Sequence, residues 1–180
     1  MIITAQYMKK YNMEIPYLLK QPIFKDNRGS FTPVKLNNTW VQSNISINSN
    51  IYTFRGMHLQ SAPKQQSKLV SAIQGRIVDI VIDLRKDSET YKKVDSFILE
   101  EGDSVYVPKG YAHGFLTLTP NTIVNYLIDE EYSPENEISI LWSSIPDVKS
   151  TIDRFCFSNI DNDVVFSDKD KQGINLNEIL

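Results

Sequence analysis

Two glycine-punctuated segments of the sequence each carry one of its two histidines. Residues 55–60 place an arginine, the turn glycine Gly56, His58 and a glutamine within six positions. Residues 107–115 surround His113 with two glycines and several apolar residues. A neutral imidazole can accept a proton near neutral pH, because its ordinary pKa is about 6.5. We therefore predict that His58 is a base. We also expect the two segments to face each other inside a small β-barrel.

The histidine count argues against a metal centre. Zinc and non-haem iron sites usually have three or more protein ligands that include histidines. This chain has two histidines, far apart and without a His-x-His pair, and its single cysteine, Cys156, lies in a different context. We expect no metal and no cofactor. Any anionic intermediate would then have to be stabilised by side chains.

Length and composition favour one globular domain over residues 1–180, with 41% hydrophobic and 23% charged residues. A net charge of −3 without a clustered basic stripe argues against binding a nucleic acid polymer. No apolar run approaches the roughly 18–20 residues that a membrane-spanning helix needs. The N-terminus lacks the features of a signal peptide. These observations predict a cytoplasmic protein that does not bind membranes.

The elements that would position these residues have the pattern of strands. The clearest strand is residues 76–84, where apolar side chains alternate along one face. They are Val78, Ile80, Ile82 and Leu84. The other face mixes two aliphatic residues with two aspartates: Ile77, Asp79, Val81 and Asp83. Residues 68–73 are predicted to pair with this strand through a hairpin at Gln74-Gly75.

Further short strands follow at the spacing expected of a sandwich or barrel. They are expected at residues 15–19, 29–34, 40–47, 96–99, 104–107, 114–117, 122–128 and 138–142. Only the last dozen residues, from Lys169, suggest a short helix or an irregular tail. The sequence therefore predicts an all-β domain of antiparallel strands, for which a jelly roll is a common way of enclosing a cavity.

Eight segments of the chain, taken in order, resemble the dTDP-4-dehydrorhamnose 3,5-epimerase family of cupin-like jelly rolls. They are Phe24-x-Asp26-x-Arg28-Gly29-x-Phe31, Val41-Gln42-Ser43-Asn44, residues 55–60, Lys68-Leu69-Val70, residues 75–85 with Asp79 and Asp83, residues 107–115, Tyr126 with Tyr132-x-Pro134-Glu135-x-Glu137, and Ser167-Asp168-Lys169-Asp170. The resemblance spans about residues 15–173, and it implies the family's cupin-type fold and activity.

Three positions depart from the family pattern. Pro33 stands where the family usually has a glutamate, and residues 142–144 replace a Trp-Asn-Asp-Pro segment. The chain between Trp142 and Ser167 is longer than the family pattern, so the placement of Asp170 depends on the last motif alone. The first two departures bear on which sugar fits the site.

The resemblance implies epimerisation next to a ketone. A base removes a proton from one face of the carbon, the enolate is held, and an acid returns a proton to the other face. His58 would be the base, and Asp170 would orient it and stabilise the imidazolium. Lys68 would hold the enolate oxygen by charge, and His113 could share that role. Tyr126 would be the acid, with nearby cations making its phenolate accessible.

The same resemblance implies a nucleotide-sugar substrate, most simply a dTDP-linked 4-keto-6-deoxy sugar. Arg28 and Arg55 would bind the diphosphate, because guanidinium groups match phosphate oxygens. Tyr132 would stack on the base. The other residues expected to contact the substrate are Phe31, Gln42, Asn44, Gln60 and Glu137. Family members often pass the Arg28 segment to a second subunit, so a homodimer with a shared N-terminal segment is expected.

Several alternatives remain open at this point. The enzyme could invert C3, C5 or both, depending on which carbons Tyr126 reaches. A 3,4-ketoisomerase could use the same scaffold, although the Tyr126 match argues against it. A catalytically silent cupin that binds a nucleotide sugar would keep the binding residues and lose the acid–base set. His58, Lys68 and Tyr126 are all present, which favours an enzyme.

Overall fold

The structure is a computed structural model that describes residues 15–20, 24–26, 29–31, 39–156 and 163–179. The strands are β1 (Tyr17–Leu19), β2 (Phe24–Asp26), β3 (Gly29–Phe31), β4 (Gln42–Asn48), β5 (Phe54–Gln60), β6 (Lys68–Gln74), β7 (Ile77–Asp83), β8 (Val94–Leu99), β9 (Ser104–Val107), β10 (Tyr111–Thr117), β11 (Thr122–Ile128) and β12 (Glu137–Ser139). The helical elements are η1 (Pro134–Asn136), η2 (Trp142–Ser144), α2 (Pro146–Phe155), α4 (Asp168–Lys171) and η3 (Leu176–Glu178).

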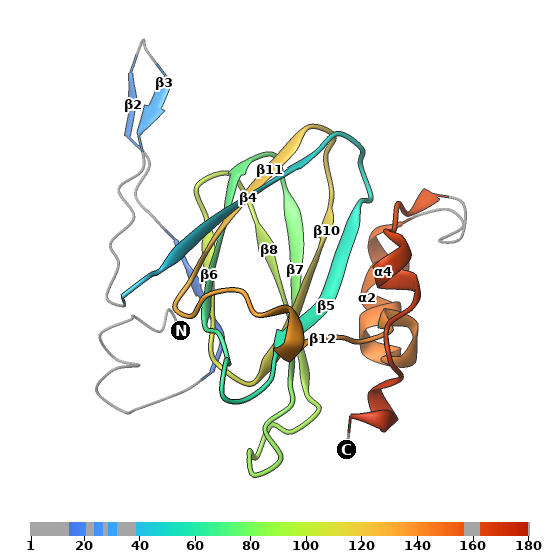
Figure 1. Ribbon diagram of the computed structural model, residues 1–180. Coiled ribbons are helices and arrows are strands. Elements are labelled where there is room, and N and C mark those ends of the chain that lie inside the picture. The colour runs from blue at the N-terminus through green and yellow to red at the C-terminus, as the bar shows by residue number, and fades with distance from the viewer. Residues whose placement is uncertain (1–14, 21–23, 27–28, 32–38, 157–162, 180) are drawn as a thin grey trace.

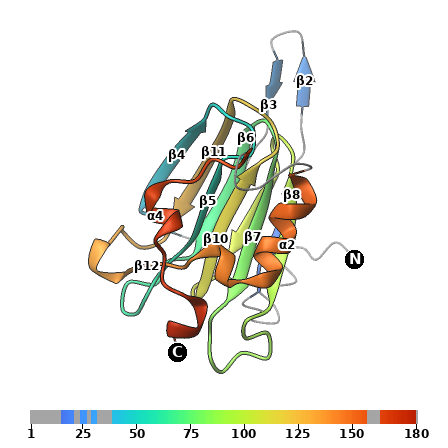
Figure 2. The same cartoon turned by 90° about the vertical axis from the view of Figure 1, so that its right-hand side faces the viewer.

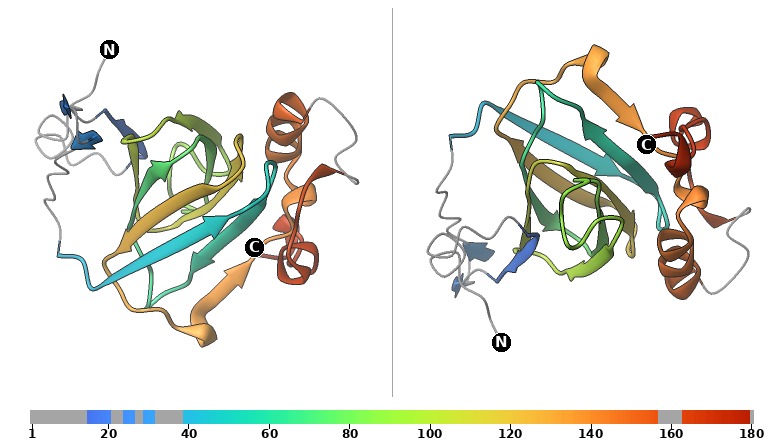
Figure 3. Two further views of the ribbon diagram at one scale, coloured as in Figure 1. Left: turned by 90° about the horizontal axis from the view of Figure 1, so that it is seen from above. Right: turned by 90° about the horizontal axis from the view of Figure 1, so that it is seen from below.

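Ten of the strands form two five-stranded antiparallel sheets that face each other, as Figures 1 and 3 show. One sheet has the order β1-β9-β6-β11-β4, and the other has the order β12-β5-β10-β7-β8. Strands β2 and β3 form a separate hairpin. This arrangement confirms the predicted all-β jelly roll of antiparallel strands with a short helical tail.

Strand β7 is buried on both faces, including the face that carries Asp79 and Asp83. Ile77 and Val81 point into the core between the sheets, together with residues of β6, β9 and β10. Val78, Ile80 and Ile82 belong to a second core, which also contains residues of α2. Figure 2 shows α2 and α4 lying over the outer face of the sheet that contains β5, β10 and β7. The helices therefore cover the apolar outer face of the sheet that carries both histidines.

The predicted hairpin between residues 68–73 and 76–84 is wrong. Strand β6 pairs with β9 and β11, whereas β7 pairs with β8 and β10. The turn at Gly75 therefore carries the chain from one sheet to the other. Gly75 has a φ of 81°, and a Cβ there would lie 2.5 Å from Thr119 Oγ1. The tight turn was recognisable from sequence, but the pairing partners of its two strands were not.

Helix α2 was not predicted, although its sequence contains a helix signal. Pro146 occupies the first turn, where a missing N–H costs nothing. Val148, Thr151 and Ile152 are buried on one side of the helix, at the spacing of an amphipathic helix. The short C-terminal helix expected from Lys169 is α4, followed by η3. The strand expected at residues 138–142 ends at Ser139. No helix in the described part of the chain is long and apolar enough to cross a bilayer.

Candidate active site

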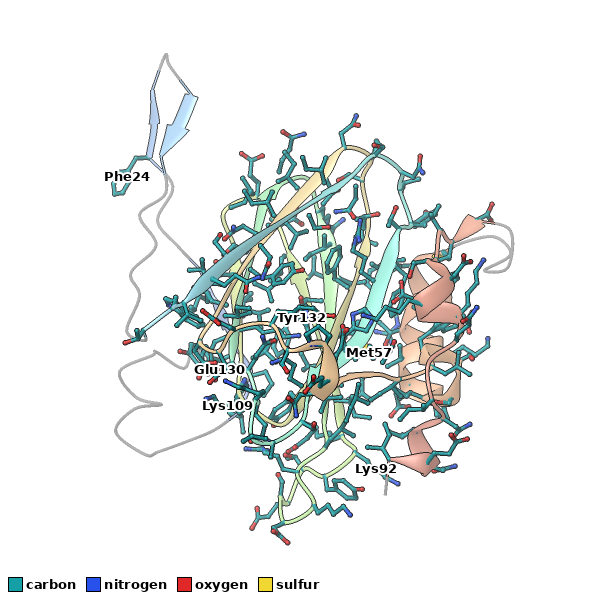
Figure 4. All side chains as sticks on the ribbon, in the orientation of Figure 1. Phe24, Met57, Lys92, Lys109, Glu130 and Tyr132 are labelled. Atoms are coloured by element: carbon teal, nitrogen blue, oxygen red, sulfur yellow. The ribbon has the colours of Figure 1, made fainter. Side chains whose placement is uncertain are left out.

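A cavity of about 420 Å³ lies between the two sheets. It brings together every predicted site residue whose side chain the structure describes: Gln42, Asn44, Arg55, His58, Gln60, Lys68, His113, Tyr126, Tyr132, Glu137 and Asp170. Arg28 lies outside the described residues, and Phe31 is described only by its place in β3. Figure 4 shows Tyr132 on the connection that crosses the front of the barrel.

The prediction that the two histidine segments face each other inside the barrel is wrong, because they are neighbouring strands of one sheet. His58 of β5 pairs with His113 of β10, and Arg55 pairs with Phe115. Between these pairs β5 advances three residues while β10 advances two, which is a β-bulge. The bulge lets Arg55 and His58, three residues apart, both line the cavity. The residues that face them come from β6 and β11 of the other sheet.

Gly56 lies in the bulge of β5 rather than in a turn. Its φ is 143°, which is strained for residues with a side chain. A Cβ on Gly56 would lie 2.5 Å from the Cα of Gly114 on β10. The two glycines therefore allow a close approach of the strands that carry His58 and His113.

His58 and Asp170 form a dyad at one wall of the cavity. Nε2 of His58 lies 2.9 Å from Oδ1 of Asp170, whose side chain is 3% exposed. Ser167 caps α4, and its hydroxyl donates to Oδ2 of Asp170 at 2.6 Å. The backbone N–H of Gly56 also points at Oδ1, at 3.4 Å. The carboxylate is thus held from several sides, and Nδ1 of His58 is left to meet a substrate.

Electrostatics at Asp170 favour the ionised carboxylate. Burial raises the pKa of this carboxyl, but the contact with His58 and the hydrogen bond from Ser167 outweigh burial, and the pKa falls below its ordinary value. A carboxylate that remains charged can stabilise the imidazolium formed when His58 takes a proton. The greater length of the chain between Trp142 and Ser167 therefore does not displace Asp170 from His58.

Lys68 enters the cavity from the first residue of β6 and is 9% exposed. Burial lowers its pKa from 10.5 to about 8, and the nearby carboxylates of Asp79 and Glu137 oppose the shift. Nζ lies 3.4 Å from the backbone oxygen of His58 on the opposite sheet. A buried ammonium group in this place can stabilise an oxyanion more strongly than an exposed lysine can.

His113 lies deeper in the cavity, paired with a residue that was not predicted to belong to the site. Its Nε2 is 2.7 Å from Oδ2 of Asp79, which is fully buried. Burial raises the pKa of Asp79, while His113 and Lys68 oppose the rise. The sequence signal was available, because Asp79 alternates with aliphatic residues on the inner face of β7. Asp79 therefore links His113 electrostatically to Lys68.

Tyr126 is half-buried on β11, where it pairs with Val70 of β6 and Asn44 of β4. Burial raises the pKa of its hydroxyl, and Arg55 opposes that rise only in part. The expectation that nearby cations make the phenolate accessible is therefore wrong, because desolvation is the larger effect. A phenol that keeps its proton is suited to donating it.

The polar end of the cavity is organised by side-chain amides. Nε of Arg55 donates to Oδ1 of Asn48 at 2.8 Å, and Asn48 is 2% exposed. This bond leaves the terminal nitrogens of Arg55 for an anion. Gln42 and Asn44, on the same face of β4 as Asn48, are joined by a 2.7 Å hydrogen bond.

Tyr132, Glu137 and Lys169 form a connected group at the mouth of the cavity. The hydroxyl of Tyr132 donates to Oε2 of Glu137 at 2.6 Å, and Nζ of Lys169 lies 2.5 Å from Oε1. Burial raises the pKa of Glu137, but Lys169 and Tyr132 bring it below its ordinary value. Lys169 and Ser167 also line the cavity and were not predicted to do so, although both stand in the motif that identified Asp170.

Comparison with known proteins agrees with this geometry. Residues 12–178 match the family described as dTDP-4-dehydrorhamnose 3,5-epimerase. The enzyme of that name from Sinorhizobium fredii is 34% identical over 152 residues, which are 78% of this chain and 77% of the relative.

Two solved structures have a similar fold. The dTDP-4-dehydrorhamnose 3,5-epimerase of Bacillus anthracis, crystallised with TDP and PPi bound, has a TM-score of 0.76 and 36% identity, covering 89% of this chain and 94% of that one. The dTDP-6-deoxy-D-glucose-3,5-epimerase of Legionella pneumophila, in complex with dTDP-4-keto-L-rhamnose, has a TM-score of 0.78 and 28% identity, covering 92% and 89%. By sequence and by fold, the chain belongs to the dTDP-4-dehydrorhamnose 3,5-epimerase family.

Proposed function

We propose that this protein is an isomerase that inverts C3, C5 or both in a dTDP-linked 4-keto-6-deoxy sugar, in deoxysugar biosynthesis of the dTDP-L-rhamnose type. The observation that carries the proposal is the arrangement of His58 against Asp170 on one wall of a cavity, with Lys68 and Tyr126 on the facing sheet. The relatives bearing the epimerase name support the same reaction class.

In this mechanism Nδ1 of His58 removes the proton from the carbon next to the C4 ketone. The electrons of the C–H bond move onto the ketone oxygen, and the resulting enolate is held by the ammonium group of Lys68, with His113 beside it. Tyr126 then donates its proton to the opposite face of the carbon, and the configuration is inverted. Proton exchange with solvent restores the imidazole and the phenol.

The nucleotide part of the substrate would occupy the polar end of the cavity. Arg55, held by Asn48, and Arg28 would bind the diphosphate, while Tyr132 would stack on the base. Gln42, Asn44, Glu137 and Lys169 would supply hydrogen bonds. TDP bound to the Bacillus anthracis relative and the dTDP-sugar bound to the Legionella relative support a dTDP-linked substrate.

A homodimer is part of the proposal. The outer face of β4 exposes Ile45 and Ile47, at 69% and 68%, and Ile73 of β6 is 52% exposed. Apolar side chains gathered on one sheet face favour a protein partner. The β2–β3 hairpin stands clear of both sheets in Figures 1 and 2 and is thus placed to reach a second copy. Ile47→Lys should lower the mass found by light scattering to that of a monomer, and an unchanged mass would count against this interface.

Residues 1–180 would act as one domain in the cytoplasm, with Arg28 and Phe31 of one copy completing the site of the other. Phe31 would line the sugar pocket of that site.

Proton NMR in D₂O tests the activity and its regiochemistry. With dTDP-4-keto-6-deoxyglucose, we expect the protein to place deuterium at C3, C5 or both, faster than the buffer does. Exchange at a single carbon would identify a mono-epimerase. Binding without exchange would identify a silent cupin, and migration of the ketone to C3 would identify a ketoisomerase. Either of these last two results would overturn the proposal.

A further inference from the structure

Two connections lie against each other at the mouth of the cavity. Residues 61–67 join β5 to β6, and residues 129–136 join β11 to β12 and carry Tyr132. The backbone N–H of Ser61 donates to the carbonyl of Asn136 at 2.9 Å. At the other end, the backbone N–H of Ser67 donates to the side chain of Asp129 at 2.7 Å. These two hydrogen bonds hold residues 129–136 against residues 61–67.

The side chain of Gln60 bonds to the backbone on both sides of Tyr132. Its Oε1 accepts from the N–H of Ser133 at 2.7 Å, and its Nε2 donates to the carbonyl of Glu131 at 3.2 Å. The same Nε2 donates to the carbonyl of Lys64 at 2.6 Å. Gln60 is 4% exposed. Both of its donors are used on backbone oxygens, which favours a positioning role over direct contact with a substrate.

Gln66 makes a second contact of the same kind. Its Nε2 donates to the carbonyl of Glu130 at 2.8 Å, and the residue is 9% exposed. The two glutamines thus bind three backbone groups within residues 130–133, next to Tyr132. We call this pair of side chains, Gln60 and Gln66, the amide clamp.

The side chain of Tyr132 is only partly buried, so packing alone does not fix its orientation. It is 50% exposed, and its hydroxyl donates to Glu137. An aromatic ring gains most from stacking when its orientation is fixed before binding, since ordering it on binding costs entropy. A buried amide that loses its partner is costly, so the clamp favours one position of the connection.

We propose that the amide clamp positions Tyr132 for the nucleobase of the substrate, so that Gln60 and Gln66 determine nucleotide affinity without taking part in the proton transfers. This inference rests on the proposed function. Gln60 stands two residues after His58 on β5, so one strand would carry the base of the reaction and also position the nucleotide platform.

Gln60→Glu tests the clamp with little change of shape. The carboxylate loses both N–H donors and faces the carbonyl oxygens of Lys64 and Glu131, so the connection should shift. We expect the Kd for dTDP, measured by calorimetry, to rise roughly tenfold, within the range that loss of base stacking covers. The KM should rise in parallel, while kcat should stay within about twofold. Gln66→Glu should act in the same direction and serves as the second variant if Gln60→Glu does not fold.

A matched control and a double-mutant cycle separate the clamp from a general structural effect. Lys64→Ala removes the exposed 2.9 Å ion pair to Glu130 between the same two connections, and it should leave the Kd within about twofold. Tyr132→Ala should raise the Kd to a similar extent as Gln60→Glu. In the Tyr132→Ala background, Gln60→Glu should add less than about twofold.

The outcomes distinguish the clamp from the proposed function. Full additivity of the two changes, or unchanged dTDP affinity in folded Gln60→Glu and Gln66→Glu proteins, would overturn the clamp. A fall in kcat at constant dTDP affinity would also overturn it, because it would place Gln60 in the chemistry. A wild-type protein that neither binds dTDP nor exchanges protons in the sugar would instead refute the proposed function.

Discussion

Replacing Asp170 with asparagine removes one charge from the dyad and keeps its shape. The carboxylate lies 2.9 Å from Nε2 of His58, and its side chain is 3% exposed. At an effective dielectric constant of about 20, two unit charges about 4 Å apart interact by ~4 kcal/mol. A charge-assisted hydrogen bond alone contributes ~1.5–3 kcal/mol. Because the imidazolium forms only during the reaction, this loss falls on kcat, which should drop by roughly a hundredfold to a thousandfold.

The assay is the deuterium exchange rate at saturating substrate, with folding checked by circular dichroism. Stability should change by less than ~1.5 kcal/mol, because an asparagine oxygen can still accept the 2.6 Å hydrogen bond from Ser167. Asp168→Asn is the matched control, since Asp168 is exposed on the same helix and should tolerate the change. A folded Asp170→Asn protein with kcat within threefold of wild type would refute the role given to Asp170.

Further predictions at three residues follow from the contacts around the cavity. Exchange by the wild-type protein should fall as the pH rises through about 8, because Lys68 loses its proton there; Lys68→Met should abolish exchange at every pH. Lys68→Met should also raise the free energy of unfolding at pH 7 by up to ~3 kcal/mol. Burial lowers the pKa of Lys68 from 10.5 to about 8, so the charged lysine destabilises the folded wild type, and methionine removes that cost. That gain over wild type should shrink between pH 8 and 10.5, and a variant less stable than wild type at pH 7 would contradict the reasoning. Ser167→Ala removes the cap of α4 and a hydrogen bond to Asp170, so it should cost about 1 kcal/mol of stability and roughly tenfold in kcat; a loss of stability at constant kcat would leave Ser167 without a positioning role. Asn48→Ala removes the hydrogen bond that orients the side chain of Arg55, so it should raise the Kd for dTDP roughly fivefold at nearly constant kcat. Unchanged affinity in calorimetry would exclude Asn48 from a role in anion binding.

Local patterns in the sequence predicted the strands and the chemistry they carry. Alternation along residues 76–84 predicted the strand, and the aliphatic neighbours of Asp79 could have placed that residue inside the barrel. His58, Lys68 and Tyr126 stood out because their types suit the reaction that the family resemblance implies.

Long-range geometry was not accessible from those patterns. Gly75 predicts a tight turn equally well for a hairpin and for a crossing between sheets, so the pairing of β6 was missed. The side-by-side placement of the two histidine strands depends on β10 lying between β5 and β7. The side chain of Gln60 forms hydrogen bonds with the backbone of Glu131 and Ser133, which are distant in sequence. The motif around Gln60 therefore suggested a substrate contact, whereas the geometry favours a positioning role.

The most direct test of the account is the exchange rate of a His58→Ala variant in D₂O. We expect a folded protein that still binds dTDP, because Arg55 and Tyr132 are untouched, but that places no deuterium in the sugar above the buffer rate. Near-normal exchange at C3 or C5 by that variant would contradict the claim that His58 removes the proton.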